Sequence, residues 1–299
     1  MQPTTIIPQQ KVSETNPLIQ EKTIRNGLSY HDDFTNLKII VTGASKGIGR
    51  IIAMNLLEAG AQVALVARTK LELEKIAQRY PMKATVYAYD LSDPMQINVC
   101  FKKIIEHFKC ELDLVFHCAG KYQNQKLDDL TMREWDESQN INCRAMVHLT
   151  GLAVPFIEQS AAPNKSIVVL TADNNAAPIS GEVSFSVAKA MANMFIQCMA
   201  LELAEKKIRI NGVAPTVVET AFRVGDLKKG ITTVQNQTYI DTYATVKPLK
   251  SESKLPDAIN VADIALWLAS NEANFITGEV IKIDDAFSLS SLIPKPKPQ

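Results

Sequence analysis

The sequence predicts an α/β fold: a single doubly wound parallel sheet with helices on both faces. Two observations predict it. Short runs of branched and apolar residues alternate with amphipathic stretches along most of the chain, which is typical of buried parallel strands joined by helical crossovers. A glycine-rich turn follows the first run and opens the first amphipathic stretch, which is typical of a Rossmann-type sheet. The 299 residues are enough for one such domain with tails.

Seven segments are predicted strands, because each is short, rich in β-branched residues and apolar on both faces. In chain order they are Lys38–Thr42, Gln62–Ala67, Thr85–Tyr89, Leu112–His117, Ser166–Leu170, Arg209–Val213 and Val280–Ile283. Long helices are expected from about Trp135 to Glu158 and from about Ser184 to Ala204. The second is apolar around much of its circumference, so it needs cover on two sides. Burial within one chain and an interface with a second copy both satisfy that need.

The two ends of the chain differ in composition from the segment between them. Residues 1–36 are polar and carry scattered prolines, which predicts an N-terminal extension. Residues 37–290 form the predicted domain, and residues 291–299 form a Pro/Lys tail whose alternating prolines exclude helix. Extensions of this kind suit a homo-oligomer or a subunit of a larger assembly.

Charge and cysteine content limit the classes of function. The formal net charge is zero and no basic block occurs, so no nucleic-acid partner is expected. Five scattered cysteines form no CxxC pair, which predicts reduced thiols, no metal site and an intracellular, by default cytoplasmic, location. No stretch predicts a transmembrane segment or a secretory signal. A mitochondrial location is the alternative, because the first residues are polar and poor in acidic side chains.

The glycine-rich turn is the strongest motif. A strand, a tight turn and a helix in succession place backbone N–H groups and a helix N-terminus where a phosphate can sit. Gly43 permits the turn, Gly47 lets a pyrophosphate approach, and Gly49 lets the helix pack against the strand. Ser45, Lys46 and Ile48 complete the loop. A loop that serves only as a tight turn, with no cofactor bound, is the alternative.

Cofactor preference follows from the end of the second predicted strand. An NAD site needs a carboxylate there for the ribose hydroxyl. This chain instead has Arg68 after Ala67, and Lys46 lies within the glycine loop. Two cations and no acid favour the 2′-phosphate of NADP(H) over NAD(H). Alternatively, both side chains are solvated surface charges.

The glycine loop, together with Asn142 and Lys189, resembles the short-chain dehydrogenase/reductase family over about residues 37–290. That resemblance implies cofactor contacts by segments that follow later strands, and a substrate lid over residues 221–258. It also implies a turn of the Asn-Asn-Ala-Gly type, of which this chain keeps only the last two residues. The implied contact residues are Asp90, Leu91, Ala119, Gly120, Lys189, Pro215, Val218 and Thr220.

The resemblance also implies an asparagine, a serine, a tyrosine and a lysine as the catalytic set. Asn142 and Lys189 match, but Phe185 stands at the tyrosine position and Ala172 at the serine position. No tyrosine lies between Tyr122 and Tyr239 that a shifted alignment could recover. Thr171 is expected to point to the face opposite Ala172, because neighbours on a strand alternate.

Loss of both hydroxyl groups suggests a loss of ordinary carbonyl reduction. General acid–base catalysis typically contributes about 10² to 10⁴ in rate. The leading hypothesis is therefore a catalytically degraded short-chain dehydrogenase/reductase-like protein that binds NADP(H) and acts as a structural or regulatory subunit. The alternative is an active NADPH-dependent oxidoreductase with an atypical proton donor. A scaffold with an empty pocket is a third hypothesis.

Overall fold

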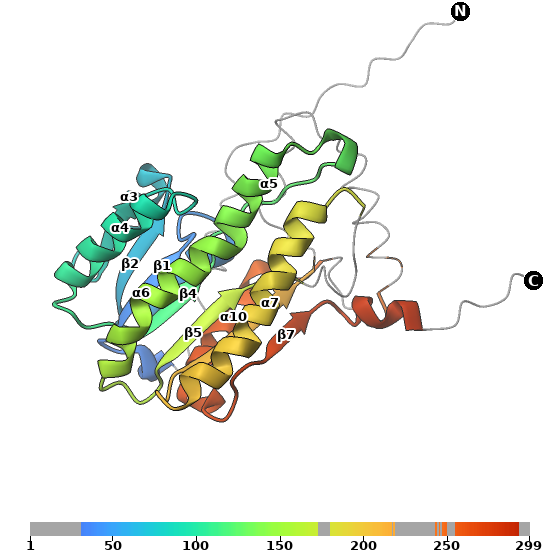
Figure 1. Cartoon of the computed structure of the whole chain (residues 1–299). Coiled ribbons are helices and arrows are strands. Elements are labelled where there is room, and N and C mark those ends of the chain that lie inside the picture. Colours follow the sequence, from blue (N-terminus) through green and yellow to red (C-terminus); the bar gives the residue numbers. More distant parts are fainter. Residues whose placement is uncertain are drawn as a thin grey trace, which may run out of the picture.

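The protein is built on one seven-stranded parallel sheet with the strand order β3-β2-β1-β4-β5-β6-β7 (Figure 1). This computed structural model describes residues 31–172, 180–216, 218, 243, 245, 247–249 and 255–292. The strands are β1 Lys38–Thr42, β2 Gln62–Ala67, β3 Ala84–Ala88, β4 Leu114–His117, β5 Ser166–Leu170, β6 Arg209–Pro215 and β7 Val280–Ile283. The predicted α/β fold is confirmed, and the predicted strands differ from these by no more than two residues at either end.

Helices cover both faces of the sheet (Figure 1). One core cluster packs α2, α3 and α10 on one face, and a second packs α4, α6 and α7 on the other. Their bounds are α2 Gly47–Glu58, α3 Lys70–Ala77, α4 Pro94–His107, α5 Met132–Gln139, α6 Ala145–Gln159, α7 Val183–Ala204 and α10 Ala258–Ala269. Short helical turns are η1 His31–Phe34, η2 Leu127–Asp129, η5 Asn271–Ala273 and η6 Phe287–Leu292.

One long helix between β4 and β5 is interrupted. A π-helical turn, Asn140–Arg144, joins α5 to α6, so the predicted helix over 135–158 runs from Met132 to Gln159 with an irregular centre. Thr131 starts α5 through a capping box with Glu134. Single π turns inside α-helices occur frequently at functional sites.

The order of the strands creates a crevice at the carboxyl ends of β1 and β4. Thr42, the last residue of β1, pairs with Val66 on one side and His117 on the other. After β1 the chain continues to β2 on one side, and after β4 it continues to β5 on the other side. The two connections therefore diverge at the carboxyl ends of these neighbouring strands. Ligands of open α/β sheets bind at such a point.

The folded domain begins before the predicted boundary at residue 37. Phe34 in η1 is 1% exposed and belongs to the core on the α2 side. The Asp33 carboxylate accepts hydrogen bonds from the Asn271 backbone N–H at 2.8 Å and from its side-chain amide at 2.7 Å. Composition alone missed this attachment because it depends on one aromatic residue and one distant partner. Residues 1–30 and 293–299 lie outside the described part of the chain.

Helix α7 reaches the length and apolarity of a membrane span, which the sequence analysis did not expect. It has 22 residues and a mean hydropathy of 1.2 over its most apolar window. Its Ala188, Ala192 and Ile196 are fully buried against the sheet. A Cβ added to Gly212 of β6 would lie 2.8 Å from Ile196 Cδ1, so helix and strand approach closely. This is the packing of a helix in a protein core.

Candidate functional site

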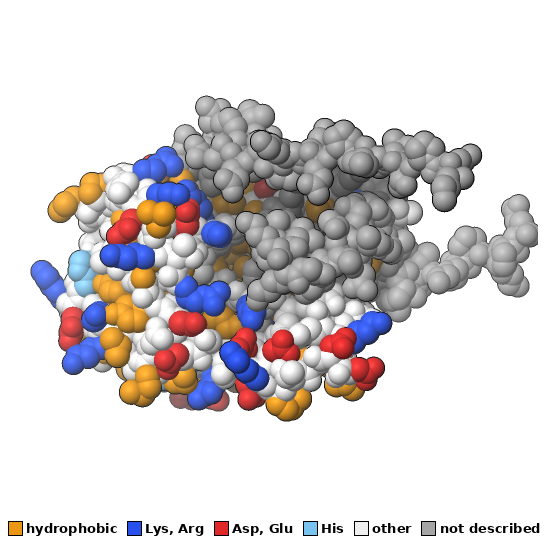
Figure 2. All heavy atoms as spheres, turned by 90° about the horizontal axis from the view of Figure 1, so that it is seen from above, with side chains coloured by type: hydrophobic (Ala, Val, Ile, Leu, Met, Phe, Trp, Pro, Cys, Tyr) orange, Lys and Arg blue, Asp and Glu red, His pale blue; other side chains and the backbone are white. Residues whose placement is uncertain are grey.

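A cavity of about 320 Å³ opens at the carboxyl ends of the strands, and in Figure 2 a hollow with Lys and Arg side chains along one side is visible from above. Residues after β1, β2, β3, β4, β5 and β6 all contribute to its wall. The predicted site residues that line it are Gly43, Ser45, Lys46, Gly47, Ile48, Gly49, Arg68, Leu91, Ala119, Gly120, Ala172, Phe185, Lys189, Pro215 and Val218.

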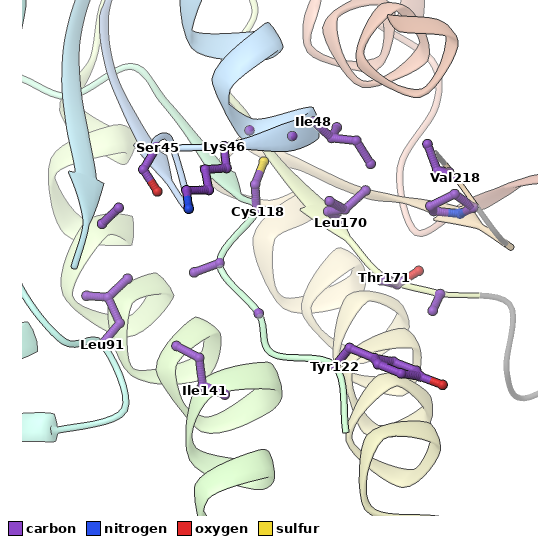
Figure 3. A pocket seen from close by; sticks show the side chains of 18 of the residues that line it. Ser45, Lys46, Ile48, Leu91, Cys118, Tyr122, Ile141, Leu170, Thr171 and Val218 are labelled. Atoms are coloured by element: carbon purple, nitrogen blue, oxygen red, sulfur yellow. The ribbon is translucent and has the colours of Figure 1, made fainter. Parts of the chain in front are cut away.

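The loop between β1 and α2 forms one end of the cavity, where Ser45 and Lys46 lie (Figure 3). Gly43 has φ +66°, and a Cβ there would be 2.7 Å from the Cys118 carbonyl carbon. A Cβ on Gly49 would be 2.6 Å from the Gly43 oxygen. Side chains are thus excluded at both positions, and the backbone forms an open cradle.

The N-terminus of α2 meets this cradle. Its N-cap residue, Lys46, makes no side-chain capping hydrogen bond. The first N–H groups of a helix have no intrahelical partner, and the helix dipole adds positive potential at that end. Gly47, with φ +56°, starts the helix and also lines the cavity. The cradle therefore fits the pyrophosphate of a dinucleotide.

Two cationic side chains, Lys46 and Arg68, lie at the same end of the cavity. Both are exposed. Arg68 Nη1 lies 4.0 Å from a carboxylate oxygen of Asp90, a surface ion pair of the weak kind. Asp90 itself is held by Ser92, whose backbone N–H and hydroxyl both donate to Oδ1, at 2.9 and 2.8 Å. Asp90 contacts Arg68 and does not line the cavity wall.

Lys189 points from α7 to the end of β5. Its Nζ donates to the Leu170 carbonyl at 2.8 Å and lies 5.8 Å from the centre of the Phe185 ring. Burial lowers the pKa of Lys189 to about 8, while the thiols of Cys118 and Cys143 act in the opposite direction. A buried ammonium needs a hydrogen-bond acceptor, and a ribose hydroxyl could take the place of the Leu170 carbonyl as that acceptor. Lys189 therefore fits a cofactor site.

An apolar cluster adjoins Lys189 in the cavity wall. It consists of Tyr122, Ala172 and Phe185, each at most 6% exposed. The rings of Tyr122 and Phe185 meet edge to face, with centroids 5.5 Å apart and planes at 73°. Figure 3 shows Tyr122 and Thr171 at the end of the cavity away from Ser45 and Lys46. Thr171 and Ala172 both line the cavity just beyond Leu170, the last residue of β5.

Asn142 lies in the π-helical turn, behind the cavity wall. Its side-chain oxygen accepts from the Lys121 backbone N–H, and its amide donates to the Lys121 carbonyl, both at 2.9 Å. The amide also donates to Ser138 Oγ at 3.3 Å. The described hydrogen bonds of the Asn142 side chain therefore fix the segment that leads into Tyr122.

The sequence model of one protein family, described as enoyl-(acyl carrier protein) reductase, matches residues 43–288. The chain belongs to the short-chain dehydrogenase/reductase family. Members of this family bind NAD(P)(H), and the cradle, the uncapped helix N-terminus and Lys189 fit that cofactor. The match spans the whole sheet beyond β1 and includes every residue that lines the cavity.

Similar proteins include several reductases. L-xylulose reductase of Caenorhabditis elegans is 29% identical over 267 residues, which cover 86% of this chain and 97% of the relative. The 3-oxoacyl-(acyl-carrier-protein) reductase of Thermotoga maritima is 27% identical over 82% of this chain and 95% of its own length. A crystal structure of a Sinorhizobium meliloti protein assigned to the short-chain alcohol dehydrogenases has a TM-score of 0.74. That structure is 24% identical and covers 86% of this chain and 98% of its own, so it shows the fold alone.

The sequence analysis missed several cavity residues of this family member. Tyr89 directly follows β3, so the rule that sites form at the carboxyl ends of strands could have found it. Tyr122 was noticed but could not be placed, and Glu182, its partner, gave no signal in the sequence. Thr220 lies outside the described residues, as does most of the predicted lid over 221–258.

Proposed function

We propose that this protein is an NADP(H)-dependent oxidoreductase that works without the serine and tyrosine hydroxyls of its family. One observation carries the proposal: a cavity lined by Lys46, Arg68 and Lys189 also contains Ala172 and Phe185 and, beside them, the phenol of Tyr122. When bound, the cofactor supplies hydride to, or removes it from, a substrate carbon. The chain supplies the phosphate cradle, the cations and the apolar wall.

The preference for NADP(H) rests on charge. A 2′-phosphate brings negative charge to the end of the cavity where Lys46 and Arg68 lie, and charge-assisted hydrogen bonds contribute about 1.5–3 kcal/mol each. The described residues that follow β2 include no carboxylate that lines the cavity. Asp90 is nearby, but its pair with Arg68 is long and partly solvated.

A second candidate function is a cofactor-loaded subunit with a structural or regulatory role. The apolar cluster of Tyr122, Ala172 and Phe185 supports it, because it removes both family hydroxyls from the place where a substrate oxygen would be polarised. An exposed apolar stripe on α7 also suits a subunit that binds another protein chain.

Calorimetric titration of the purified full chain with NADPH and, separately, with NADH tests the proposal. We expect micromolar affinity for NADPH and at least tenfold weaker binding of NADH. The variant Arg68→Ala should lose most of that difference, whereas Lys102→Ala, which removes an exposed lysine on α4, should keep it.

Three results would count against the proposal. No binding of either nucleotide leaves a scaffold with an empty pocket. Equal binding of both rejects the role assigned to the two cations. NADPH binding without turnover of any carbonyl or enone compound favours the regulatory subunit over the enzyme.

A further inference from the structure

We propose that Tyr122, paired with Glu182, is the proton-donating hydroxyl of this cavity, and that the pair acts on a carbonyl or alcohol substrate. The inference rests on the proposed function as an NADP(H)-dependent oxidoreductase. It assigns a catalytic role to Tyr122 and a positioning and proton-accepting role to Glu182. Tyr122 lies outside α7, the helix that carries Phe185 and Lys189, and Glu182 is the N-cap residue of that helix.

Tyr122 is held in one place by its own segment. It follows the turn His117–Gly120 at the end of β4, and Gly120 and Tyr122 both line the cavity. The N–H and the carbonyl of Lys121, the residue before Tyr122, both form hydrogen bonds with the Asn142 side chain. Tyr122 is 2% exposed, so its ring cannot swing into solvent. Its orientation is therefore set before any ligand arrives.

The ring of Tyr122 packs against both positions that lack a hydroxyl group. It forms one buried cluster with Ala172 and Phe185, and its edge-to-face contact with Phe185 has a centroid distance of 5.5 Å. Lys189 Nζ lies 5.8 Å from the centre of the Phe185 ring. Tyr122, from the segment that follows β4, therefore lines the same cavity as Phe185 of α7, and its ring contacts the Phe185 ring. Figure 3 shows Tyr122 with its hydroxyl oxygen directed away from Ser45 and Lys46.

The phenol is paired with a carboxylate. The Tyr122 hydroxyl donates to Glu182 Oε1, and the Asn124 amide donates to the Tyr122 oxygen at 3.3 Å. Glu182 is 1% exposed and is the N-cap residue of α7, yet its side chain does not cap the helix. A buried carboxylate is costly unless it is hydrogen-bonded, and the positive end of a 22-residue helix stabilises it.

Two chain segments meet tightly around this pair. The Gln125 backbone N–H donates to the Gly181 carbonyl at 2.5 Å. Gly181 has φ +88°, and a Cβ there would lie 2.5 Å from Asn124 Oδ1. Only glycine lets residues 122–125 and 181–182 approach this closely. The pair is therefore built by the fold and shielded from bulk water.

The geometry supports a balanced proton transfer. In alcohol oxidation, the Tyr122 oxygen takes the proton of the substrate hydroxyl and passes its own proton to Glu182. The C–H bond of the alcohol breaks and its electron pair leaves as hydride to NADP⁺, so the substrate becomes a carbonyl compound. In reduction, Glu182 returns its proton to Tyr122 as Tyr122 protonates the substrate oxygen, and NADPH supplies the hydride.

Turnover of an aromatic diketone, phenanthrenequinone, with NADPH is the first measurement. Tyr122→Phe should lower kcat by about 10² to 10⁴ while the NADPH affinity measured by calorimetry stays within about twofold. Tyr80→Phe is the matched control, because Tyr80 also donates to a glutamate, Glu58, at 2.5 Å, but outside the cavity. That variant should retain wild-type turnover.

A rescue variant separates loss of the proton donor from loss of cavity shape. In the Tyr122→Phe background, Ala172→Ser with Phe185→Tyr returns both hydroxyls to the family positions. Turnover should recover by at least tenfold over Tyr122→Phe alone. If the triple variant binds NADPH but its turnover does not recover, the loss in Tyr122→Phe comes from a changed cavity shape. That outcome overturns the proposal.

A readout without substrate tests the pair itself. Tyrosine labelled with ¹³C at Cζ reports the hydrogen bonding of each phenol by NMR, and Tyr122→Phe assigns the Tyr122 resonance in the NADP⁺-loaded and free protein. Glu182→Gln should move this resonance and leave that of Tyr80 unchanged. An unmoved Tyr122 resonance would overturn the proposal.

The failures of the two proposals are distinguishable. Absence of NADPH binding by the wild-type chain contradicts the proposed function. NADPH binding with no turnover by the wild type also contradicts the proposed enzyme function. Full turnover by Tyr122→Phe contradicts the assignment of Tyr122 alone.

Discussion

Two side chains in the cavity wall, Ala172 and Phe185, differ from serine and tyrosine by one hydroxyl group each. Both are buried, and Lys189 lies beside Phe185 with its ammonium 5.8 Å from the ring. The space and the neighbouring cation that a tyrosine hydroxyl needs are therefore present. On our proposal, only the oxygen atoms are missing at these two positions.

Restoring both hydroxyls should raise carbonyl reduction. We expect Ala172→Ser with Phe185→Tyr to increase NADPH-dependent turnover of phenanthrenequinone by about 10² or more, because an oxyanion donor alone contributes about 10² to 10³. Each single variant should gain less, since groups that act as a unit are not additive. NADPH oxidation followed by absorbance measures the rate. A folded, cofactor-binding double variant with unchanged turnover would show that damage extends beyond these positions.

His117 predicts an acid-sensitive fold. Burial lowers its pKa to about 3, and its Nε2 lies 3.0 Å from Thr150 Oγ1. Below the unfolded pKa of about 6.5, the unfolded chain binds a proton that the folded chain does not, so stability falls as the pH falls. By pH 5 this contribution should reach about 2 kcal/mol.

Urea unfolding at pH 7 and pH 5 measures this loss. The variant His117→Asn should show a smaller decrease in the free energy of unfolding between the two values, because it has no imidazole to protonate. Equal decreases in the variant and the wild type would mean that other groups cause the acid sensitivity.

At the scale of elements, the turn after β7 carries backbone strain. Asp285 and Ala286 have φ values of +50° and +63°, in the left-handed region that favours glycine. Asp285 is held there by Lys247, at 2.8 Å, and by the Tyr243 hydroxyl, at 3.1 Å. Asp284 accepts from the Ala286 and Ser288 backbone N–H groups. These polar contacts offset the cost of the conformation.

Glycine at position 286 should stabilise the protein. The left-handed conformation raises the free energy of a non-glycine residue by about 1–2 kcal/mol, and glycine removes that strain. Part of the gain is offset because glycine has more conformational freedom in the unfolded chain. We expect Ala286→Gly to raise the free energy of unfolding by about 1 kcal/mol, measured by urea denaturation. Ala59→Gly is the matched control, because Ala59 has φ −67°, and it should be neutral or destabilising. A loss of stability in Ala286→Gly would contradict the assigned strain.

For the whole molecule, the outer side of α7 is the feature without a role in the cavity. One helical face of α7 is apolar and at least 37% exposed along its length, whereas the opposite face packs on the sheet. Its members recur at spacings of four, four, three and seven residues and are Val183, Val187, Met191, Met194 and Leu201. A stripe of this kind suits an interface, and we propose a second copy of this chain as its partner.

Light scattering at micromolar concentration tests self-association. We expect a mass of at least twice 33.0 kDa for the wild type. Met194→Glu places a charge in the stripe and should shift the mass to 33.0 kDa. Met82→Glu, at an exposed methionine outside α7, should leave the mass unchanged. A wild-type monomer would remove this proposal.

The sequence predicted most of the fold and 15 of the 24 residues that line the cavity. Buried parallel strands are continuous apolar runs, so β1, β2, β5 and β7 were predicted with the bounds that the structure gives. The glycine loop was recognised because its chemistry is local: three glycines, a strand and a helix adjoin in the chain. Phe34 was assigned to the polar extension because its attachment depends on core packing and on the contact of its neighbour Asp33 with Asn271, more than two hundred residues away.

The sequence by itself determined the family, the parallel sheet, the phosphate cradle and the absence of hydroxyl groups at Ala172 and Phe185. All of these follow from residue type and short spacing. Only the tertiary structure decided that Tyr122 and Glu182 meet beside Phe185, because these residues lie 60 positions apart in the chain. The end of β4, the start of α7 and the hydrogen bonds of Asn142 to Lys121 bring them together. Contacts between distant segments depend on how helices pack against the sheet, and that packing leaves no local pattern in the chain.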